Sequence, residues 1–282
     1  MMSKFKHILI TRFNLSSQNR EWTNSYAHIK EEWMKHRWDL FTQYCLPSII
    51  NQSTKNFTWF IYFDKTTSNS FREKIGALSQ KHPFIFPIFI ESYEVFMANL
   101  SLDILKVKEN ETTHFISSRI DNDDCFHRDA IKTIQRQFSG QDYQLINLAK
   151  GLCLQTIPPF LASTYSYYSG PFVSLIEKMP LEGNLKTVME KDHHDYFHEQ
   201  VVTQIESDTY WVQVIHKYNI ANKMRGRPVK VDLTKNDFGF DLQINNSFSY
   251  LRRLSYYLLI QLPVLSIKNF LKKLTGRPVT FK

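Results

Sequence analysis

The ten residues from Phe115 to Asp124, FISSRIDNDD, constrain the fold of this chain more than any other stretch. An apolar start typical of a β-strand leads into three carboxylates, Asp121, Asp123 and Asp124. Like charges this close repel one another, so the stretch is either a solvated acidic turn with a helix cap or a site where a cation offsets the repulsion. In open α/β sheets ligands bind just outside the carboxyl ends of the strands, where these acids would lie. Carboxylate oxygens suit Mg²⁺ or Mn²⁺, and both ions commonly hold a diphosphate.

Other apolar runs predict the sheet that carries this stretch. Compact runs at His7–Phe13, Phe57–Phe63 and Phe84–Ile90 are typical of buried strands, and Pro83 and Pro87 indicate an edge or a bulge at the third. Helical spacing separates them, at residues 38–49 and at residues 70–80, with Pro47 interrupting the first helix. This order predicts an α/β fold with a mostly parallel central sheet flanked by helices. Further along, residues 143–154 predict a strand pair or hairpin, and residues 210–216 predict a strand that ends on His216.

Composition narrows the class of protein. The 282 residues are 43% hydrophobic and 15% aromatic, which is typical of a globular chain with a proper core. The formal charge of +8 suits nucleic acid, an anionic membrane or phosphorylated ligands. Three cysteines without CxxC spacing make a disulfide framework or a zinc site unlikely and favour a reducing compartment. The N-terminus lacks the pattern of a signal peptide, and no run of about 18 apolar residues predicts a transmembrane helix, so we expect a cytoplasmic protein.

The C-terminal segment has a different character from the rest of the chain. Residues 250–273 mix leucines and aromatics with five basic side chains. The longest apolar stretch, Leu254 to Ile267, has 14 residues and contains Pro263, which is too short to span a bilayer and suitable for lying on an anionic one. The alternative is a C-terminal helix packed on the domain with a basic solvent face.

Several pieces of this sequence together resemble the bacterial rhamnosyltransferases, which are glycosyltransferases of the GT-A fold. The pieces are ITRF, LFTQYCLPSIINQ, NFTWFIYFD, SSRIDNDDCFHRDAI, SGPFVSLIE and WVQVIHKYNIANKMRGR. They extend from Ile10 to Arg227, and RIDNDD, which resembles the DxD motif of this fold, is the most specific. The resemblance implies a GT-A-like domain over residues 1–236 with a basic, helical C-terminal tail over residues 237–282. It also implies transfer of a sugar with inversion, from a nucleotide-diphosphate donor of the UDP or dTDP type to a glycan or lipid-linked acceptor. The family label indicates rhamnose as the sugar.

The resemblance assigns the nucleotide-sugar site to strand ends and to one late loop. Thr11, Arg12 and Phe13 would border the nucleoside, and Asp64 would accept a hydrogen bond from the imide N–H of the base, although it could equally be a turn residue. Arg119 would orient the acids or meet phosphate. Arg225 and Arg227 would close over the diphosphate, or form an ordinary basic loop.

The same resemblance implies Mn²⁺ or Mg²⁺ as cofactor. Asp121 and Asp123 would hold the ribose side and the metal, with Asp124 as a second ligand or a helix N-cap. His216 is the candidate third ligand, and its alternative is a structural histidine at the end of a strand.

The catalytic base is expected in the polar run from Glu190 to Asp195. An acceptor hydroxyl needs a base as the anomeric carbon becomes oxocarbenium-like, and a carboxylate is the usual group. Asp192 comes first, then Asp195, with His193 and His194 as rivals. The run departs from the Glu-Asp pair usual in related enzymes, and it could instead be a solvated charged face.

Two other classes of function remain open at this point. A sugar-phosphate nucleotidyltransferase would share the sheet and the acids but would carry a Gly-rich loop near the first strand, and this chain has 8 Gly with none before Gly76. A non-catalytic basic protein could bind nucleic acid or a membrane surface, but the aromatic residues lie mostly in apolar runs, which is typical of a core. We therefore expect no nucleic-acid partner. The C-terminal tail favours peripheral attachment of the protein to the inner membrane.

Overall fold

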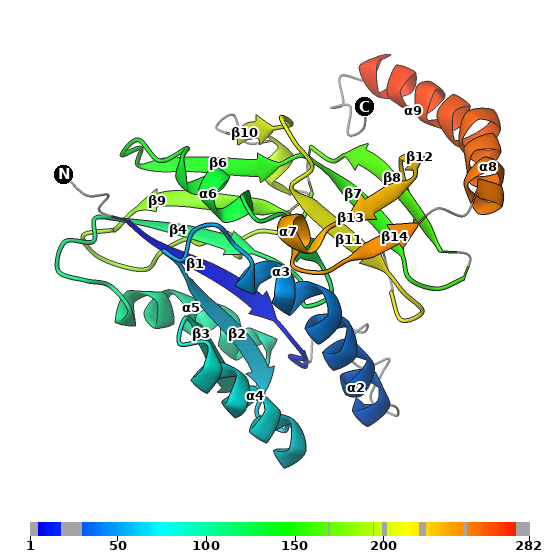
Figure 1. Ribbon diagram of the computed structural model, residues 1–282. Coiled ribbons are helices and arrows are strands. Elements are labelled where there is room, and N and C mark those ends of the chain that lie inside the picture. The colour runs from blue at the N-terminus through cyan, green and yellow to red at the C-terminus, as the bar shows by residue number, and fades with distance from the viewer. Residues whose placement is uncertain are drawn as a thin grey trace.

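The chain folds around two β-sheets, one of seven and one of five strands, that lie next to each other (Figure 1). A third sheet has two strands. The structure is a computed structural model, and it describes residues 5–17, 30–158, 160–168, 170–193, 195–198, 202–219, 224–244 and 247–274. His194, a rival for the catalytic base, therefore lies outside the described residues.

The larger sheet has seven strands in the order β10-β6-β9-β4-β1-β2-β3. Four of its neighbouring pairs are parallel, and β9 pairs antiparallel with both β4 and β6. The predicted α/β fold with a mostly parallel sheet is therefore confirmed, and β3 lies at an edge, which is one of the two alternatives that the prolines indicated. The strands are β1 (Phe5–Arg12), β2 (Thr58–Asp64), β3 (Ile85–Ile90), β4 (His114–Arg119), β6 (Tyr143–Leu148), β9 (Val173–Lys178) and β10 (Val202–Ile205).

Helices cover both faces of this sheet, which explains why its central strands are almost wholly apolar. In β2, Trp59, Ile61 and Phe63 face one cluster of buried side chains, while Phe60 and Tyr62 face another. The first cluster includes residues of α3 (Leu46–Ile50), α4 (Asn69–Lys81) and α6 (Ala130–Gln135), and the second includes residues of α5 (Tyr93–Lys106). The helix α2 (Lys30–Leu40) continues into α3 through a π-helical turn, Phe41–Cys45, just before Pro47. The predicted interruption at this proline is thus a local widening of one helix.

The smaller sheet has the strand order β12-β8-β7-β11-β5. The predicted hairpin over residues 143–154 is wrong in its pairing, because β6 joins the larger sheet and the next strand, β7, joins the smaller one. Leu148 and Lys150 belong to the two different strands, so the chain crosses from sheet to sheet at Ala149. The strands of this sheet are β5 (Cys125–Phe126), β7 (Lys150–Gln155), β8 (Leu161–Ser166), β11 (Trp211–Ile215) and β12 (Arg227–Val229).

The packed core continues past the expected domain boundary at residue 236. A small hairpin of β13 (Val231–Leu233) and β14 (Leu242–Ile244), with the short helix α7 (Lys235–Phe238) between its strands, follows β12. Phe238 and Ile244 are buried in the same cluster as side chains of the smaller sheet. The division at residue 236 stays a prediction, and the apolar contacts extend to Ile244.

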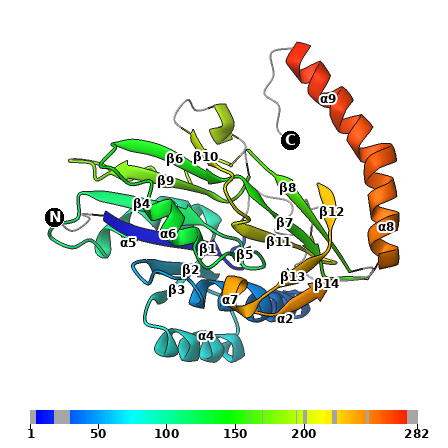
Figure 2. The same ribbon diagram turned by 45° about the horizontal axis from the view of Figure 1, so that its top comes forward.

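The chain then forms one long helix, as predicted for the C-terminal tail. This tail helix comprises α8 (Ser247–Tyr256), a π-helical turn (Tyr257–Gln261) and α9 (Leu262–Leu274). It lies beyond β12 and β14, on the opposite side of the molecule from β2 and β3, in both views (Figures 1 and 2). Within the described residues, its part Tyr250–Leu271 is long and apolar enough to cross a membrane, by length and composition only. The expectation that no helix could span a membrane rested on uninterrupted apolar runs, whereas this helix also contains polar residues.

His7 lies in the middle of the larger sheet and is completely buried. Its Nε2 lies 2.7 Å from the Ser118 Oγ, which lies 2.6 Å from the Ser174 Oγ on β9. The side-chain amide of Gln135 lies 3.2 Å from the other ring nitrogen. Burial lowers the pKa of His7 from 6.5 to about 3, so the folded protein keeps the ring neutral.

We predict that this histidine makes the protein less stable in mild acid. Because the folded-state pKa lies below the unfolded value, its contribution is complete above pH 6.5 and is lost as the pH falls toward the folded value. Between pH 7 and pH 5 the free energy of unfolding should drop by about 2 kcal/mol on this account. Urea unfolding of the wild type and of His7→Gln at both pH values measures the difference. An equal pH dependence in the two proteins would contradict the assignment.

Candidate functional site at the strand ends

The carboxyl ends of three parallel strands and one strand of the smaller sheet meet at the acidic stretch. Arg12 ends β1, Asp64 ends β2 and Arg119 ends β4, while His216 directly follows β11. After β4 the chain runs through the acids into β5, which pairs with β11. The acidic stretch therefore joins the two sheets, and this junction brings His216 to Asp123.

Asp123 is buried and is held by side chains from distant parts of the chain. The guanidinium of Arg37, on α2, donates to both carboxylate oxygens, at 2.7 Å from Nη1 and 3.0 Å from Nη2. The same Nη2 donates to the Asn122 side-chain oxygen. His216 Nε2 lies 2.9 Å from Asp123 Oδ2, and the other ring nitrogen lies 3.2 Å from His36. Burial alone would raise the pKa of Asp123, but Arg37 and His216 lower it to about 2, so the group is a carboxylate.

Asp124 has the opposite chemistry although it is the next residue. It is buried, and its Oδ1 accepts a hydrogen bond of 3.1 Å from the backbone N–H of Val214 on β11. Burial and the neighbouring carboxylates of Asp123 and Asp121 raise the pKa of Asp124 well above its ordinary value. The hydrogen bond from Val214 to Asp124 fastens the acidic stretch to the smaller sheet.

Two arginines lie beside the third acid, Asp121. The Arg12 guanidinium is 4.0 Å from the Asp121 carboxylate and lies over the ring of Tyr93, 5.5 Å from its centroid. Arg119 is 8% exposed, and within the described part of the chain its side chain makes no hydrogen bond or close ion pair. Burial, and then the positive charge of Arg12, lower the pKa of Arg119. Two adjacent cations, one of them buried, favour an anion between the strand ends.

The residues predicted to border the nucleoside differ in what they can offer. Thr11 is fully buried, donating to the Ile120 carbonyl at 2.9 Å and accepting from the Trp59 indole at 3.0 Å. Phe13 is buried in the core. Both therefore shape the end of β1 from inside, and Arg12 is the member of this group with an exposed part.

Asp64 is oriented by the loops on either side of it. One carboxylate oxygen accepts from the backbone N–H of Thr66 at 2.8 Å and from its hydroxyl, and the other accepts from the Ser16 hydroxyl at 2.7 Å. The backbone N–H of Ser16 also donates to this second oxygen at 3.4 Å. A carboxylate has about four acceptor positions, so a base would replace one of these bonds. The base-binding role stays a prediction.

The segment predicted to hold the base lies near the arginines. Asp192 and Asp195 are exposed, and the backbone N–H of Asp195 donates to the Asp192 carbonyl at 2.9 Å. The negative charge of Asp192 acts on Arg119 and partly offsets the lowering of its pKa. His193 contacts the ring of Tyr167, with centroids 6.0 Å apart. Asp192 is thus close to the acidic stretch, although the sequence places it some 70 residues later.

The structure separates the two arginines of the late loop. Arg225 lies over the ring of Tyr167, 5.8 Å from its centroid, which places it toward the segment with His193. Arg227 begins β12, at the edge of the smaller sheet, with β8 and β7 between it and β11. It is exposed there beside the tail helix and is not brought together with the acids.

The four predicted metal ligands do not fit a metal centre in this arrangement. Asp124 faces β11, and the charge of Asp123 is already paired with Arg37. Among the described residues, no three His, Cys, Asp or Glu side chains are placed to hold a metal ion. Arg37 is the residue that sequence reasoning missed. The helical spacing of Trp38, Phe41 and Cys45 could have placed it on the inner face, since Arg37 is one turn before Phe41.

Comparison with known proteins defines the class. Residues 6–228 match the family described as "Putative rhamnosyl transferase". The match covers most of the chain, so the chain belongs to this rhamnosyl transferase family. A search of curated protein sequences finds no significant match.

Among solved structures, the chain is similar to S. aureus TarS. Residues 1–349 of TarS share 13% identity over 74% of this chain and 60% of that one, with a TM-score of 0.39. The complex of the same TarS fragment with UDP-GlcNAc gives 10% identity over 77% of this chain and 60% of that one, with a TM-score of 0.41. The chain thus spans about 60% of the TarS fragment. A likeness at this level carries no argument about substrate.

We predict that replacing each of the two neighbouring acids by asparagine changes the stability of the protein by different amounts. Asp123→Asn leaves the partly buried Arg37 charge without a carboxylate, so the free energy of unfolding should fall by about 3 kcal/mol. Asp124→Asn keeps an uncharged oxygen for the Val214 N–H, so the change should stay within about 1 kcal/mol. Urea unfolding at pH 7 compares them. Equal losses would contradict the assigned charge states.

Proposed function

We propose that the protein transfers a sugar from a nucleotide-diphosphate donor to a glycan or lipid-linked acceptor, with its active site at the strand ends. The observation that carries this proposal is Arg119, a buried cation beside Arg12 whose side chain has no hydrogen-bond partner among the described residues. A diphosphate offers both guanidinium groups the paired oxygens that they bind best. Membership of the rhamnosyl transferase family supports the reaction type, and rhamnose as the donor sugar is part of the proposal.

Each residue near this anion site receives one task. Arg12 and Arg119 bind the diphosphate and stabilise the negative charge that develops on it as the glycosidic bond breaks. Asp64 accepts the imide N–H of a uracil or thymine base at the end of β2. Asp192 removes the proton from the acceptor hydroxyl, which attacks the anomeric carbon from the opposite face and gives inversion. Asp121, between the arginines and the solvent, accepts from the ribose hydroxyls.

The Mn²⁺ or Mg²⁺ cofactor stays a prediction. We assign no step of the proposed reaction to a metal ion, because Asp123 and His216 contact each other and Arg37. Binding of the nucleotide with and without a divalent ion tests the cofactor separately from the donor.

We predict that Arg119→Met makes the free protein more stable and weakens nucleotide binding. The substitution removes a buried charge that lacks a hydrogen bond, so the melting temperature should rise by a few degrees. Losing a charge-assisted contact to phosphate should weaken the affinity by about 10- to 100-fold. Thermal shift and calorimetric titration with UDP, dTDP, GDP and CDP, each with Mn²⁺, Mg²⁺ or EDTA, measure both effects. Arg136→Met, which removes an exposed arginine after α6, is the matched control.

Two results would contradict the proposal. If no nucleotide shifts the melting temperature in any of these buffers, the donor site is wrong. If Arg119→Met lowers both stability and affinity, the arginine has a structural role instead.

We predict that Asp192→Asn leaves nucleotide affinity unchanged and stops sugar transfer. The amide cannot accept the hydroxyl proton, whereas the diphosphate contacts stay in place, so the rate should fall by 100-fold or more, on the order of magnitude expected for a general base. Release of nucleoside diphosphate from the donor that the titration selects measures the rate. Asp195→Asn, in the same segment, is the matched control, and a larger loss there would move the base to Asp195.

A further inference from the structure

The tail helix carries most of the large apolar side chains that the described part of the protein exposes to solvent. Eleven of the sixteen large hydrophobic side chains that are exposed lie on it. They include Leu259 at 76% exposure, Ile267 at 60% and Phe270 at 61%, and none of the helix side chains whose burial the structure describes is buried. The other five are scattered over the rest of the chain. A continuous apolar surface of this kind marks an interaction site.

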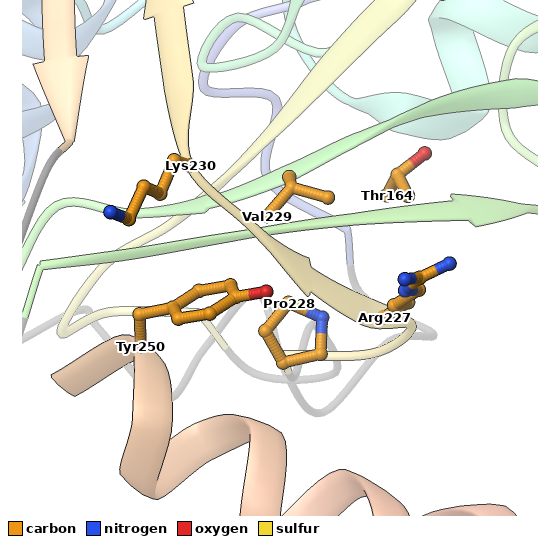
Figure 3. A pocket seen from close by; sticks show the side chains of 6 residues that line it. All are labelled: Thr164, Arg227, Pro228, Val229, Lys230 and Tyr250. Carbon is orange, nitrogen blue, oxygen red and sulfur yellow. The ribbon is translucent and has the colours of Figure 1, made fainter. Parts of the chain in front are cut away.

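Basic groups surround this apolar surface. Arg252 and Lys268 are exposed on the helix, before and after the apolar stretch Leu254–Ile267. Arg227 and Lys230 lie on the adjoining edge of the smaller sheet and line a hollow of about 390 Å³. Figure 3 shows the Tyr250 ring of the helix at this hollow, with Pro228 and Val229 of β12 between the two basic side chains. The surface therefore combines exposed apolar groups with positive charge.

The base of the helix is fastened to the domain. Arg253 Nη2 donates to the backbone carbonyl of Met224 at 3.1 Å and to the Gln261 side chain at 3.0 Å, two turns further along the helix. The helix α8 also contacts β12. The exposed apolar surface consequently keeps a fixed direction relative to the sheet edge that carries Arg227 and Lys230.

We propose that the tail helix docks the protein on an anionic lipid bilayer, lying along the surface with its apolar side chains among the acyl chains. Negative headgroups would then meet Arg252, Lys268 and the basic sheet edge. The chain's formal charge of +8 adds attraction at longer range. The proposal does not depend on the transferase reaction.

The helix Tyr250–Leu271 is long enough to cross a bilayer, but the charged residues at both ends of its apolar stretch favour lying along the surface. Leu254–Ile267 has 14 residues, which extend about 21 Å as a helix, whereas the hydrocarbon core is about 30 Å thick. Crossing would place Lys268 or Arg253 inside the core. In the surface position these groups stay at headgroup level.

The test is sedimentation of the full-length protein with vesicles of phosphatidylcholine alone or with 30 mol% phosphatidylglycerol, on the order of physiological anionic content. The protein should bind the anionic vesicles, and 0.5 M NaCl should weaken binding. Leu258→Asp should weaken partitioning by about tenfold or more. Leu102→Asp on α5, which changes a side chain of almost the same exposure (51% against 50%), should not. Lys268→Glu should weaken binding roughly tenfold, whereas Lys81→Glu, at the end of α4, is its control.

Three outcomes would overturn the proposal. The first is equal binding of wild type and Leu258→Asp. The second is wild-type protein that resists extraction by alkaline carbonate, which would show a membrane-spanning helix. The third is absence of vesicle binding together with a dimer that Leu258→Asp dissociates, which would show an interface between two copies. Nucleotide binding, measured on the same preparations, separates these outcomes from a failure of the donor site.

Discussion

The buried contact between Arg37 and Asp123 is the interaction on which the rest of the site depends. It joins α2 to the acidic stretch after β4, and through His216 it reaches β11 in the other sheet. Removing a carboxylate or a guanidinium from water costs several kcal/mol, and only a paired geometry with further hydrogen bonds offsets that cost. Asn122 and His216 supply those bonds.

Charge at the strand ends is divided unequally, and this division is what gives the site its chemistry. Arg37 and His216 lower the pKa of Asp123, while burial and the neighbouring carboxylates raise the pKa of Asp124. The Arg12 guanidinium lies 4.0 Å from the Asp121 carboxylate. The pKa of Arg119, in contrast, is lowered mainly by burial and then by the positive charge of Arg12. An arginine in this setting destabilises the free protein, and such residues cluster where a ligand later supplies the missing partner. The group in the least favourable electrostatic environment is therefore Arg119, although acidic residues outnumber arginines in this stretch.

Apolar residues serve two purposes in this chain, and their neighbours determine which one applies. In β1 and β2 they are enclosed between helices on both faces of the sheet and form the core. In the tail helix they are equally dense in the sequence but have no second layer to cover them. The same physical preference for leaving water thus builds the fold at one side of the molecule and, by our proposal, attaches it to a bilayer at the other.

The sequence by itself determined the class of fold, because apolar runs that end on polar residues, separated by helical spacing, favour a parallel sheet with its ligand site at the strand ends. It also determined that Arg12, Asp64, Arg119 and the acidic stretch would lie at one edge, since parallel strands end on the same side. The tail was readable as a helix for the same local reasons. These are properties of short segments and of their order.

Only the tertiary structure decided the charge state and the partner of each group. Nothing local distinguishes Asp123 from Asp124, yet one meets Arg37 from 86 residues away and the other meets a backbone N–H of β11. Strand pairing across two sheets likewise separated β6 from β7, which adjacency had suggested as a hairpin, and moved Arg227 to the edge beside the tail helix. Such contacts depend on which distant surfaces are buried together, and burial is what shifts a pKa and makes a hydrogen-bond partner necessary.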